Sequence, residues 1–184
     1  MSTHSPRALV IIGPPGAGCS SVGRAVGAVE GLPVLDLGRS VADELATSPD
    51  LALVAVPEGE YRRVEARVAL DLLDRAQAEG AVVALGSGCL EDPRLRDRLE
   101  RLRPGDYAVA LTCATRVLAT RNGLDAPRSV ALGTVHHQFV QMLHERQARC
   151  RELADVVVDT TSTTPRQAGE QVIEAVRSGF SHHQ

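Results

Sequence analysis

The segment Gly13–Ser20 constrains the fold of this chain more than any other feature. It reads Gly-Pro-Pro-Gly-Ala-Gly-Cys-Ser and lies between the apolar run Ala8–Ile12 and a helical pattern at Ser21–Glu30. This spacing fits G-x-x-x-x-G-K-S/T at every defined position except the lysine, which Cys19 replaces. A glycine-rich turn that leads from a buried strand into a helix is typical of phosphate binding by backbone N–H groups. The sequence therefore predicts a P-loop domain, with a chance glycine-rich turn as the alternative.

The residues of the P-loop have distinct predicted roles. Ser20 offers its hydroxyl to Mg²⁺, and Asp36, at the end of the next predicted strand, is either a second magnesium group or a capping or turn residue. Cys19 stands where the lysine would contact the terminal phosphates. The residues predicted to bind the phosphates of the cofactor are Gly13, Gly16, Ala17, Gly18, Cys19, Ser20 and Ser21.

The missing lysine has a consequence for the whole chain, because all 20 basic residues are arginine. No ammonium side chain can therefore replace it from elsewhere. Losing one preorganised donor at such a site costs roughly 10²–10³ in rate. We expect reduced affinity for ATP and Mg²⁺ and impaired phosphoryl transfer, unless a guanidinium takes the lysine's place. Arg24, Arg121 and Arg128 are the candidates for that substitution.

The Cys19 thiol admits two interpretations. It is either a small residue that fills the space of the lost lysine, or a redox-sensitive thiol whose pKa is lowered at a helix N-terminus. Cys89 also follows a glycine turn and could act with it. The four cysteines show no CxxC spacing, and we expect them to be reduced thiols of a cytoplasmic protein.

Short apolar runs alternate with helical patterns along the chain, which predicts right-handed crossovers and a parallel sheet covered on both faces. We expect an α/β fold, a three-layer α/β/α P-loop kinase fold with a five-stranded parallel sheet, in a single domain over residues 1–184 with a disordered tail at 178–184. The segment Asp50–Val56 is ambiguous between a strand, slightly favoured, and an apolar helix. The predicted strands are Ala8–Ile12, Pro33–Leu37, Ala81–Leu85, Tyr107–Leu111 and Val156–Asp159. The predicted helices are Ser21–Glu30, Arg39–Thr47, Glu60–Glu79, Arg94–Leu102, Thr115–Arg121, 134–152 and Pro165–Ser178.

Composition and charge exclude several classes of partner. The net charge is −3, which leaves no basic face strong enough to predict nucleic-acid binding. No apolar run approaches the ~20 residues of a membrane span, and the N-terminal segment Met1–Arg7 is short and polar, unlike a secretory signal. We therefore expect a cytoplasmic protein whose partner is a nucleotide or an anionic small molecule, with a protein as a further candidate partner.

Several blocks in order along the chain resemble one family. They include the P-loop block, a Gly-Glu-x-x-x-x-Glu block, a glycine turn and a lid-like arginine segment. Their order and spacing resemble the shikimate kinase family, within the nucleoside-monophosphate-kinase-like P-loop group. The blocks are Gly13–Arg24, Val34–Asp36, Gly38–Ala46, Gly59–Glu65, Leu85–Cys89, Arg121–Arg128, Arg146, Val158–Thr160 and Pro165.

The resemblance implies phosphorylation of shikimate by ATP and Mg²⁺, and it gives roles to individual residues. Arg62 and Arg146 would hold the substrate carboxylate, for which a guanidinium fork is suited. Arg128 would move with the lid toward the γ-phosphate. Without the resemblance these arginines would be interpreted as solvated surface charges. The remaining implied contacts are Gly86, Ser87 and Gly88 to the substrate, and Arg121 and Pro165 to adenine.

Departures from the family pattern bear on activity. The chain reads Asp36-Leu37-Gly38 where the family has D-T-D, so the second carboxylate, which helps activate the nucleophile, is absent. Leu51–Val56 looks like a compensating insertion, either a protein contact or a buried extra strand. The P-loop lysine and the second carboxylate are both absent, whereas the arginines that would hold the substrate carboxylate are present. This combination predicts a pseudoenzyme. The alternatives are a genuine ATP-dependent kinase of shikimate or a related small carboxylate, and a redox-sensitive binding module acting through Cys19.

Overall fold

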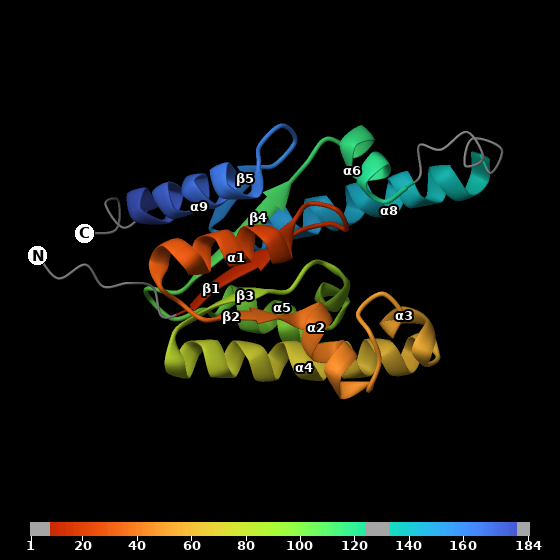
Figure 1. Cartoon of the computed structure of the whole chain (residues 1–184), viewed down its shortest axis with the longest axis horizontal. Helices are drawn as coiled ribbons and strands as arrows, with labels where there is room; N and C mark the ends of the chain where they lie inside the picture. Colours follow the sequence, from red (N-terminus) through yellow and green to blue (C-terminus); the bar gives the residue numbers. More distant parts are fainter. Residues whose placement is uncertain (1–7, 124–132, 180–184) are drawn as a thin grey trace, which may run out of the picture.

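A five-stranded parallel sheet forms the centre of the computed structural model, which describes residues 8–123 and 133–179 (Figure 1). The strands lie in the order β2-β3-β1-β4-β5, and every neighbouring pair is parallel. This confirms the predicted sheet and fold class. The bounds are β1 (Ala8–Ile12), β2 (Val34–Asp36), β3 (Ala81–Ala84), β4 (Tyr107–Thr112) and β5 (Val156–Asp159).

Helices connect the strands, and each predicted helix is present with ends shifted by a few residues at most. Ser178, where the predicted tail begins, is still helical, and residues 180–184 lie outside the described part of the chain. Within residues 8–123 and 133–179, no helix is long and apolar enough to span a membrane. The bounds are α1 (Cys19–Glu30), α2 (Leu37–Glu44), α3 (Ala52–Ala55), α4 (Glu58–Glu79), the 3₁₀-helix η1 (Gly88–Glu91), α5 (Pro93–Glu100), α6 (Thr115–Arg121), α8 (Gly133–Glu152) and α9 (Pro165–Gly179).

The strand predicted over Asp50–Val56 is wrong, because this segment contains the short helix α3. Only Ala52 of the helix is buried, and it joins the core that includes α4. Leu51, Leu53 and Val54 are exposed, whereas a strand of a parallel sheet is buried on both faces. An apolar run without a clear period cannot distinguish a strand from a helix, and that ambiguity explains the error. The alternative of a buried extra strand is excluded with it.

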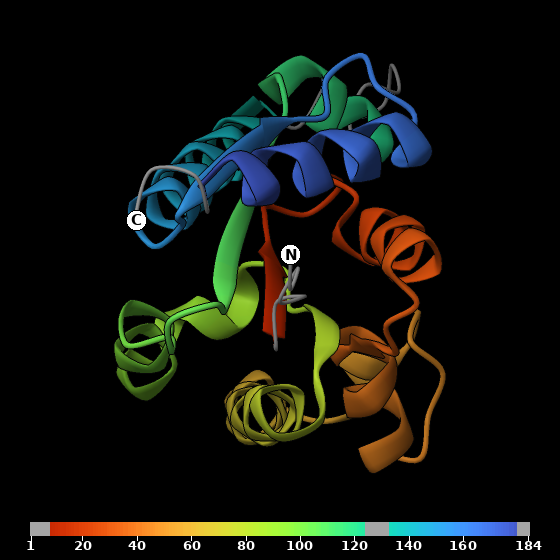
Figure 2. The same ribbon diagram turned by 90° about the vertical axis from the view of Figure 1, so that its left-hand side faces the viewer.

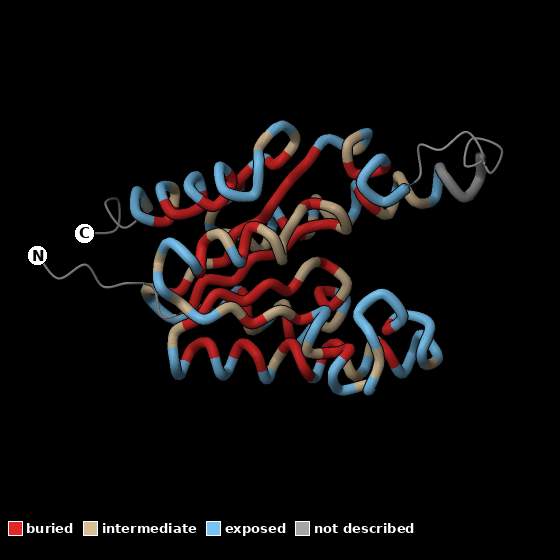
Figure 3. The backbone as a smooth tube through the Cα atoms, viewed as in Figure 1, coloured by how far each residue is buried: buried red, intermediate tan, exposed pale blue. Residues whose placement is uncertain are grey.

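The sheet separates two cores, as expected for three layers. Alternate residues of β1 point to opposite faces: Val10 and Ile12 pack in the core that includes α4 and α5, and Leu9 and Ile11 in the core that includes α1 and α9. Figure 2 shows these two pairs of helices on opposite sides of the sheet. In Figure 3 the central strands are buried along their length, so the loops at the strand ends have a rigid base.

Two glycines of α1 face the sheet, and only one of them is required for the close approach of the helix. A Cβ atom added to Gly27 would overlap the Val34 side chain and lie 2.9 Å from the carbonyl oxygen of Leu32. A Cβ added to Gly23 would meet its nearest neighbour, the Cβ of Ala84, at 3.5 Å, which is an ordinary contact. The close contact at Gly27 therefore sets the distance between α1 and the sheet.

The same substitution at these two positions should have opposite effects. We expect Gly27→Ala to lower the free energy of unfolding by about 1–3 kcal/mol, because overpacking displaces the helix or the strand. Gly23→Ala should leave it unchanged or raise it by up to about 1 kcal/mol, because alanine favours the helix. Urea denaturation of both variants measures the difference. Equal effects of the two substitutions would contradict this account of the packing.

Candidate functional site

The loops after β1 and β3 and the end of β2 meet at the carboxyl edge of the sheet, where ligands bind in folds of this kind. They border a cavity of about 490 Å³. The structure brings predicted phosphate-binding and substrate-binding residues together on its wall, although their roles as ligands stay predictions. The predicted residues that line it are Gly13, Gly16, Gly18, Cys19, Ser20, Ser21, Asp36, Arg62, Gly86, Ser87, Gly88 and Arg146.

The P-loop adopts the conformation that its glycines allow. Gly16 and Gly18 have φ angles of 85° and 98°, in the left-handed region that favours glycine. Between them, the N–H of Ala17 donates to the carbonyl oxygen of Pro14 at 3.0 Å. Helix α1 begins at Cys19, so the N–H groups of its first turn have no carbonyl before them within the helix. A helix N-terminus of this kind attracts anions.

A carbonyl clamp, formed by Asn122, Arg121 and Thr160, holds the P-loop from the side of β4 and β5. These three side chains donate to three consecutive carbonyl oxygens of the loop. The Nδ2 of Asn122 donates to Pro15 at 3.0 Å, the Nη1 of Arg121 to Gly16 at 3.0 Å, and the Oγ1 of Thr160 to Ala17 at 2.9 Å. This clamp could not be predicted from the sequence, because no motif links the P-loop to residues more than a hundred positions further along the chain.

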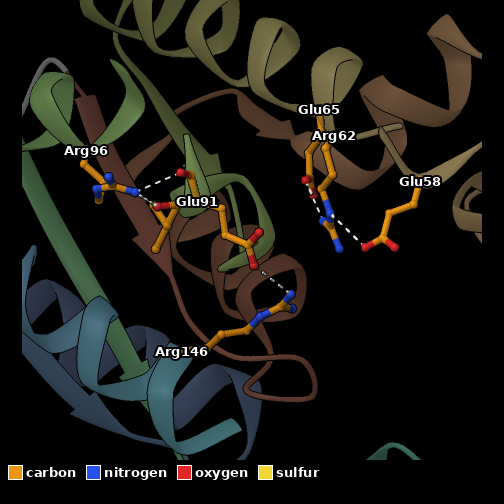
Figure 4. A network of polar contacts seen from close by, with 7 residues as sticks. Glu58, Arg62, Glu65, Glu91, Arg96 and Arg146 are labelled. Atoms are coloured by element: carbon orange, nitrogen blue, oxygen red, sulfur yellow. Dashed lines mark hydrogen bonds and ion pairs between the residues drawn. The ribbon is translucent and has the colours of Figure 1, made fainter. Parts of the chain in front are cut away.

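Two arginines at the other end of the cavity are each paired with a carboxylate (Figure 4). The Nη1 of Arg62 donates to Glu65 Oε2 at 2.8 Å, and the Nη2 of Arg146 lies 3.5 Å from Glu91 Oε1. Glu65 is buried, and burial raises its pKa although Arg62 opposes the shift. Glu91 is more than half exposed, and exposed pairs of this kind are weak. Arg146 is therefore the easier of the two to release to another anion.

Asp36 has a capping role in the structure. Its Oδ1 accepts a hydrogen bond from the N–H of Arg39 at 3.1 Å and so caps the N-terminus of α2. Asp36 also lines the cavity. Of the two roles that the sequence left open, capping is present, and magnesium binding stays a prediction.

Comparison with known proteins identifies the family. Residues 15–177 match the sequence profile described as shikimate kinase. The chain belongs to the shikimate kinase family. The shikimate kinase of Xylella fastidiosa (strain M12) is 31% identical over 166 residues, which are 90% of this chain and 89% of that one. The shikimate kinase of Halorhodospira halophila is 32% identical over 177 residues, covering 95% and 96% of the two chains.

Solved structures of shikimate kinases agree with the fold. The shikimate kinase of Acinetobacter baumannii, solved in complex with shikimate, superposes with a TM-score of 0.79. The alignment covers 98% of this chain and 97% of that one, at 21% sequence identity. At this identity the likeness supports the fold, and the chemistry of the site must be derived from the residues of this chain.

Of the two interpretations of Cys19, the redox-sensitive thiol requires a lowered pKa, and the structure indicates the opposite direction. The residue as a whole is partly exposed, but its sulfur lies against Gly13 inside the loop, 3.1 Å from where a Cβ of that glycine would be. Burial raises the pKa of the Cys19 thiol from 9.0 to about 12, and the neighbouring Cys150 adds to the shift. Burial also raises the pKa of Cys89 well above its ordinary value. Desolvation outweighs the helix N-terminus, and the redox-sensitive module loses its basis.

Neither described candidate for the lysine's place reaches the main cavity. Arg121 does not line it, because its guanidinium donates to the carbonyl oxygens of Gly16 and Thr160, both at 3.0 Å. Arg24 donates to Ser21 Oγ at 3.3 Å and is likewise absent from the wall. Arg128 lies outside the described residues. The guanidinium groups that do line the cavity belong to Arg62 and Arg146.

A second cavity, of about 360 Å³, lies on the other side of the P-loop. Arg121 and Pro165, the residues predicted to contact adenine, both line it, and so does Ala17. Arg121 is fixed there by its bonds to the backbone, so its guanidinium plane is already oriented. Stacking on a base stays a prediction.

Removing the clamp hydroxyl of Thr160 should loosen the P-loop. Thr160→Val should lower the free energy of unfolding by about 1–3 kcal/mol, because the carbonyl of Ala17 loses its donor in a buried position. It should also weaken pyrophosphate binding, measured by calorimetry. Thr160→Ser keeps the hydroxyl and is the matched control. If serine costs as much as valine, the hydroxyl does not hold the loop.

The raised pKa of Cys19 predicts slow alkylation. At pH 8, a pKa of about 12 instead of 9.0 lowers the thiolate fraction about a thousandfold. Iodoacetamide should therefore modify Cys19 about a thousandfold more slowly in the folded protein than in the urea-unfolded chain. Peptide mapping by mass spectrometry follows this residue separately from the other cysteines. Faster labelling in the folded protein would restore the redox hypothesis.

Proposed function

We propose that the chain is a shikimate-kinase-like pseudoenzyme. It binds a nucleotide or another phosphate together with an anionic carboxylate, and it transfers the phosphoryl group very slowly or not at all. One observation carries this proposal: a single cavity joins a P-loop to two arginines, whereas Cys19 stands in the P-loop where a lysine would supply an ammonium group. The P-loop and the two arginines that would bind ligands are thus present, whereas the ammonium group that would assist phosphoryl transfer is absent.

The phosphate half of the proposal rests on the P-loop backbone. Its N–H groups and the helix N-terminus attract anions without help from a side chain. The residues also fit Mg²⁺, because the Ser20 hydroxyl and the Asp36 carboxylate line the cavity and oxygen atoms are the ligands this ion prefers. When bound, the ion would neutralise phosphate charge. We expect weaker ATP binding than in a P-loop that has its lysine.

The carboxylate half rests on Arg62 and Arg146. A guanidinium offers paired N–H donors that match a carboxylate, and Arg146 can exchange exposed Glu91 for a ligand. A member of the family has been solved with shikimate, so shikimate or a related small carboxylate is the first ligand to test.

The genuine kinase is the second candidate, and family membership favours it. It requires Arg128, the predicted lid arginine, to supply the charge that Cys19 does not. A protein partner is a further proposal, with exposed Leu51, Leu53 and Val54 as the contact surface, of which Leu53 lines the cavity. The predicted location is the cytoplasm, where thiols stay reduced.

A coupled assay with ATP, Mg²⁺ and shikimate tests the proposal. We expect turnover at least roughly 10²–10³ below the ~1–100 s⁻¹ typical of kinases. Turnover within the typical range would reject the pseudoenzyme and favour the kinase. Calorimetry without turnover measures ATP and shikimate binding separately, and binding of neither would reject the proposal altogether.

Restoring the lysine should separate binding from catalysis. Cys19→Lys should bind ATP more tightly than the natural chain, because an ammonium then faces the phosphates. It should not reach normal kinase activity, because no second carboxylate follows Asp36 to activate the hydroxyl. Cys19→Met is the matched control, since it is long and uncharged. Equal ATP affinity of the two variants would contradict the charge argument.

A further inference from the structure

The two arginines that line the main cavity differ in how firmly their partners hold them (Figure 4). The Nη1 of Arg62 donates to Glu65 Oε2 at 2.8 Å, and the Glu65 side chain is only 9% exposed. The Nη2 of Arg146 lies 3.5 Å from Glu91 Oε1, and the Glu91 side chain is 57% exposed. An exposed pair at this distance contributes little free energy. The Arg62–Glu65 pair is therefore a fixed part of the wall, whereas the Arg146–Glu91 pair can open.

The backbone of Glu91 is held in place although its carboxylate is exposed. The Nη1 of Arg96 donates to the carbonyl oxygens of Leu90 and Glu91, at 2.8 Å and 2.9 Å. These two bonds fix the end of η1, the 3₁₀-helix that carries Glu91. The pair with Arg146 therefore opens by rotation of side chains, without a movement of the main chain.

Glu91 and Arg146 line different cavities. Arg146 lines the main cavity, whereas Glu91 lines a neighbouring outer cavity of about 620 Å³. Arg62, Glu65 and Gly88 line both and so form the wall between them. When Arg146 turns to a ligand in the main cavity, the Glu91 carboxylate stays in contact with water on the outer side. A charge that leaves its partner without being buried costs little free energy.

We infer that Glu91 is an internal competitor, whose carboxylate occupies Arg146 until a ligand carboxylate replaces it. A bound carboxylate offers two oxygens to two N–H donors of a guanidinium, at distances of roughly 2.7–2.9 Å. The contact with Glu91, at 3.5 Å, is longer and therefore weaker. A ligand carboxylate displaces Glu91, but its affinity is lowered by the pair that it must break. This inference rests on the carboxylate half of the proposed function.

Removing the charge of Glu91 should strengthen carboxylate binding. Calorimetry should show that Glu91→Gln binds shikimate about twofold to fivefold more tightly than the natural chain, as expected when one exposed ion pair no longer competes. Glu170→Gln is the matched control, because Glu170 is 54% exposed and pairs with Arg166 at 3.0 Å within α9. It should leave the affinity unchanged. Equal tightening by both substitutions would overturn the inference.

A shorter side chain separates competition from simple repulsion between negative charges. Glu91→Asp keeps the charge but withdraws the carboxylate by one methylene group, and the backbone held by Arg96 cannot follow it. We expect this variant to bind shikimate more tightly than the natural chain, although less tightly than Glu91→Gln. If aspartate binds like the natural chain while glutamine binds more tightly, Glu91 acts by repulsion alone and the inference is wrong.

The outcomes separate the inference from the proposed function. If the natural chain binds shikimate and neither substitution of Glu91 tightens binding, the inference is wrong and the proposed function stands. If only the variants bind shikimate measurably, competition by Glu91 is supported. If neither the natural chain nor any variant binds it, the carboxylate half of the proposed function fails and the inference fails with it.

Discussion

Three hydrogen bonds to consecutive carbonyl oxygens determine how the P-loop presents its backbone. Asn122, Arg121 and Thr160 hold these carbonyls from the side of β4 and β5, while Gly16 and Gly18 supply the left-handed turns. The loop therefore takes its shape from its own glycines and from its neighbours in the fold. The conformation of the loop and the side chain at position 19 thus depend on different atoms.

The charges that line the cavity bear differently on a carboxylate and on a polyphosphate. The charged side chains on its wall are Asp36, Glu65, Arg62 and Arg146, so two carboxylates balance two guanidinium groups. A small monocarboxylate needs only to displace exposed Glu91 from Arg146. A polyphosphate brings several negative charges to a wall on which residues 8–123 and 133–179 place no excess positive charge. Within that part of the chain, amide dipoles and an accompanying Mg²⁺ are what can offset those charges.

The sequence predicted those parts of the fold that local pattern determines. The short apolar strands and the glycine-rich loop are readable because each buried strand is a continuous apolar run and each turn requires glycine. The helical structure of the α3 segment could not be predicted, because its apolar residues show no helical or strand periodicity and most of them are exposed. The carbonyl clamp and the pairing of Arg146 with Glu91 join residues distant in sequence, and only the folded chain brings them together.

Cys19 shows why a local rule can fail at such a site. Its place at a helix N-terminus favours the thiolate, but the packing around its sulfur favours the neutral thiol, and burial dominates. The same desolvation would act against an ammonium at this position, because burial disfavours whichever form is charged. A lysine there relies on bound phosphate to offset that cost, whereas a thiol needs no counter-charge. The substitution thus suits an unliganded loop, and it removes the group that would have held the terminal phosphate during transfer.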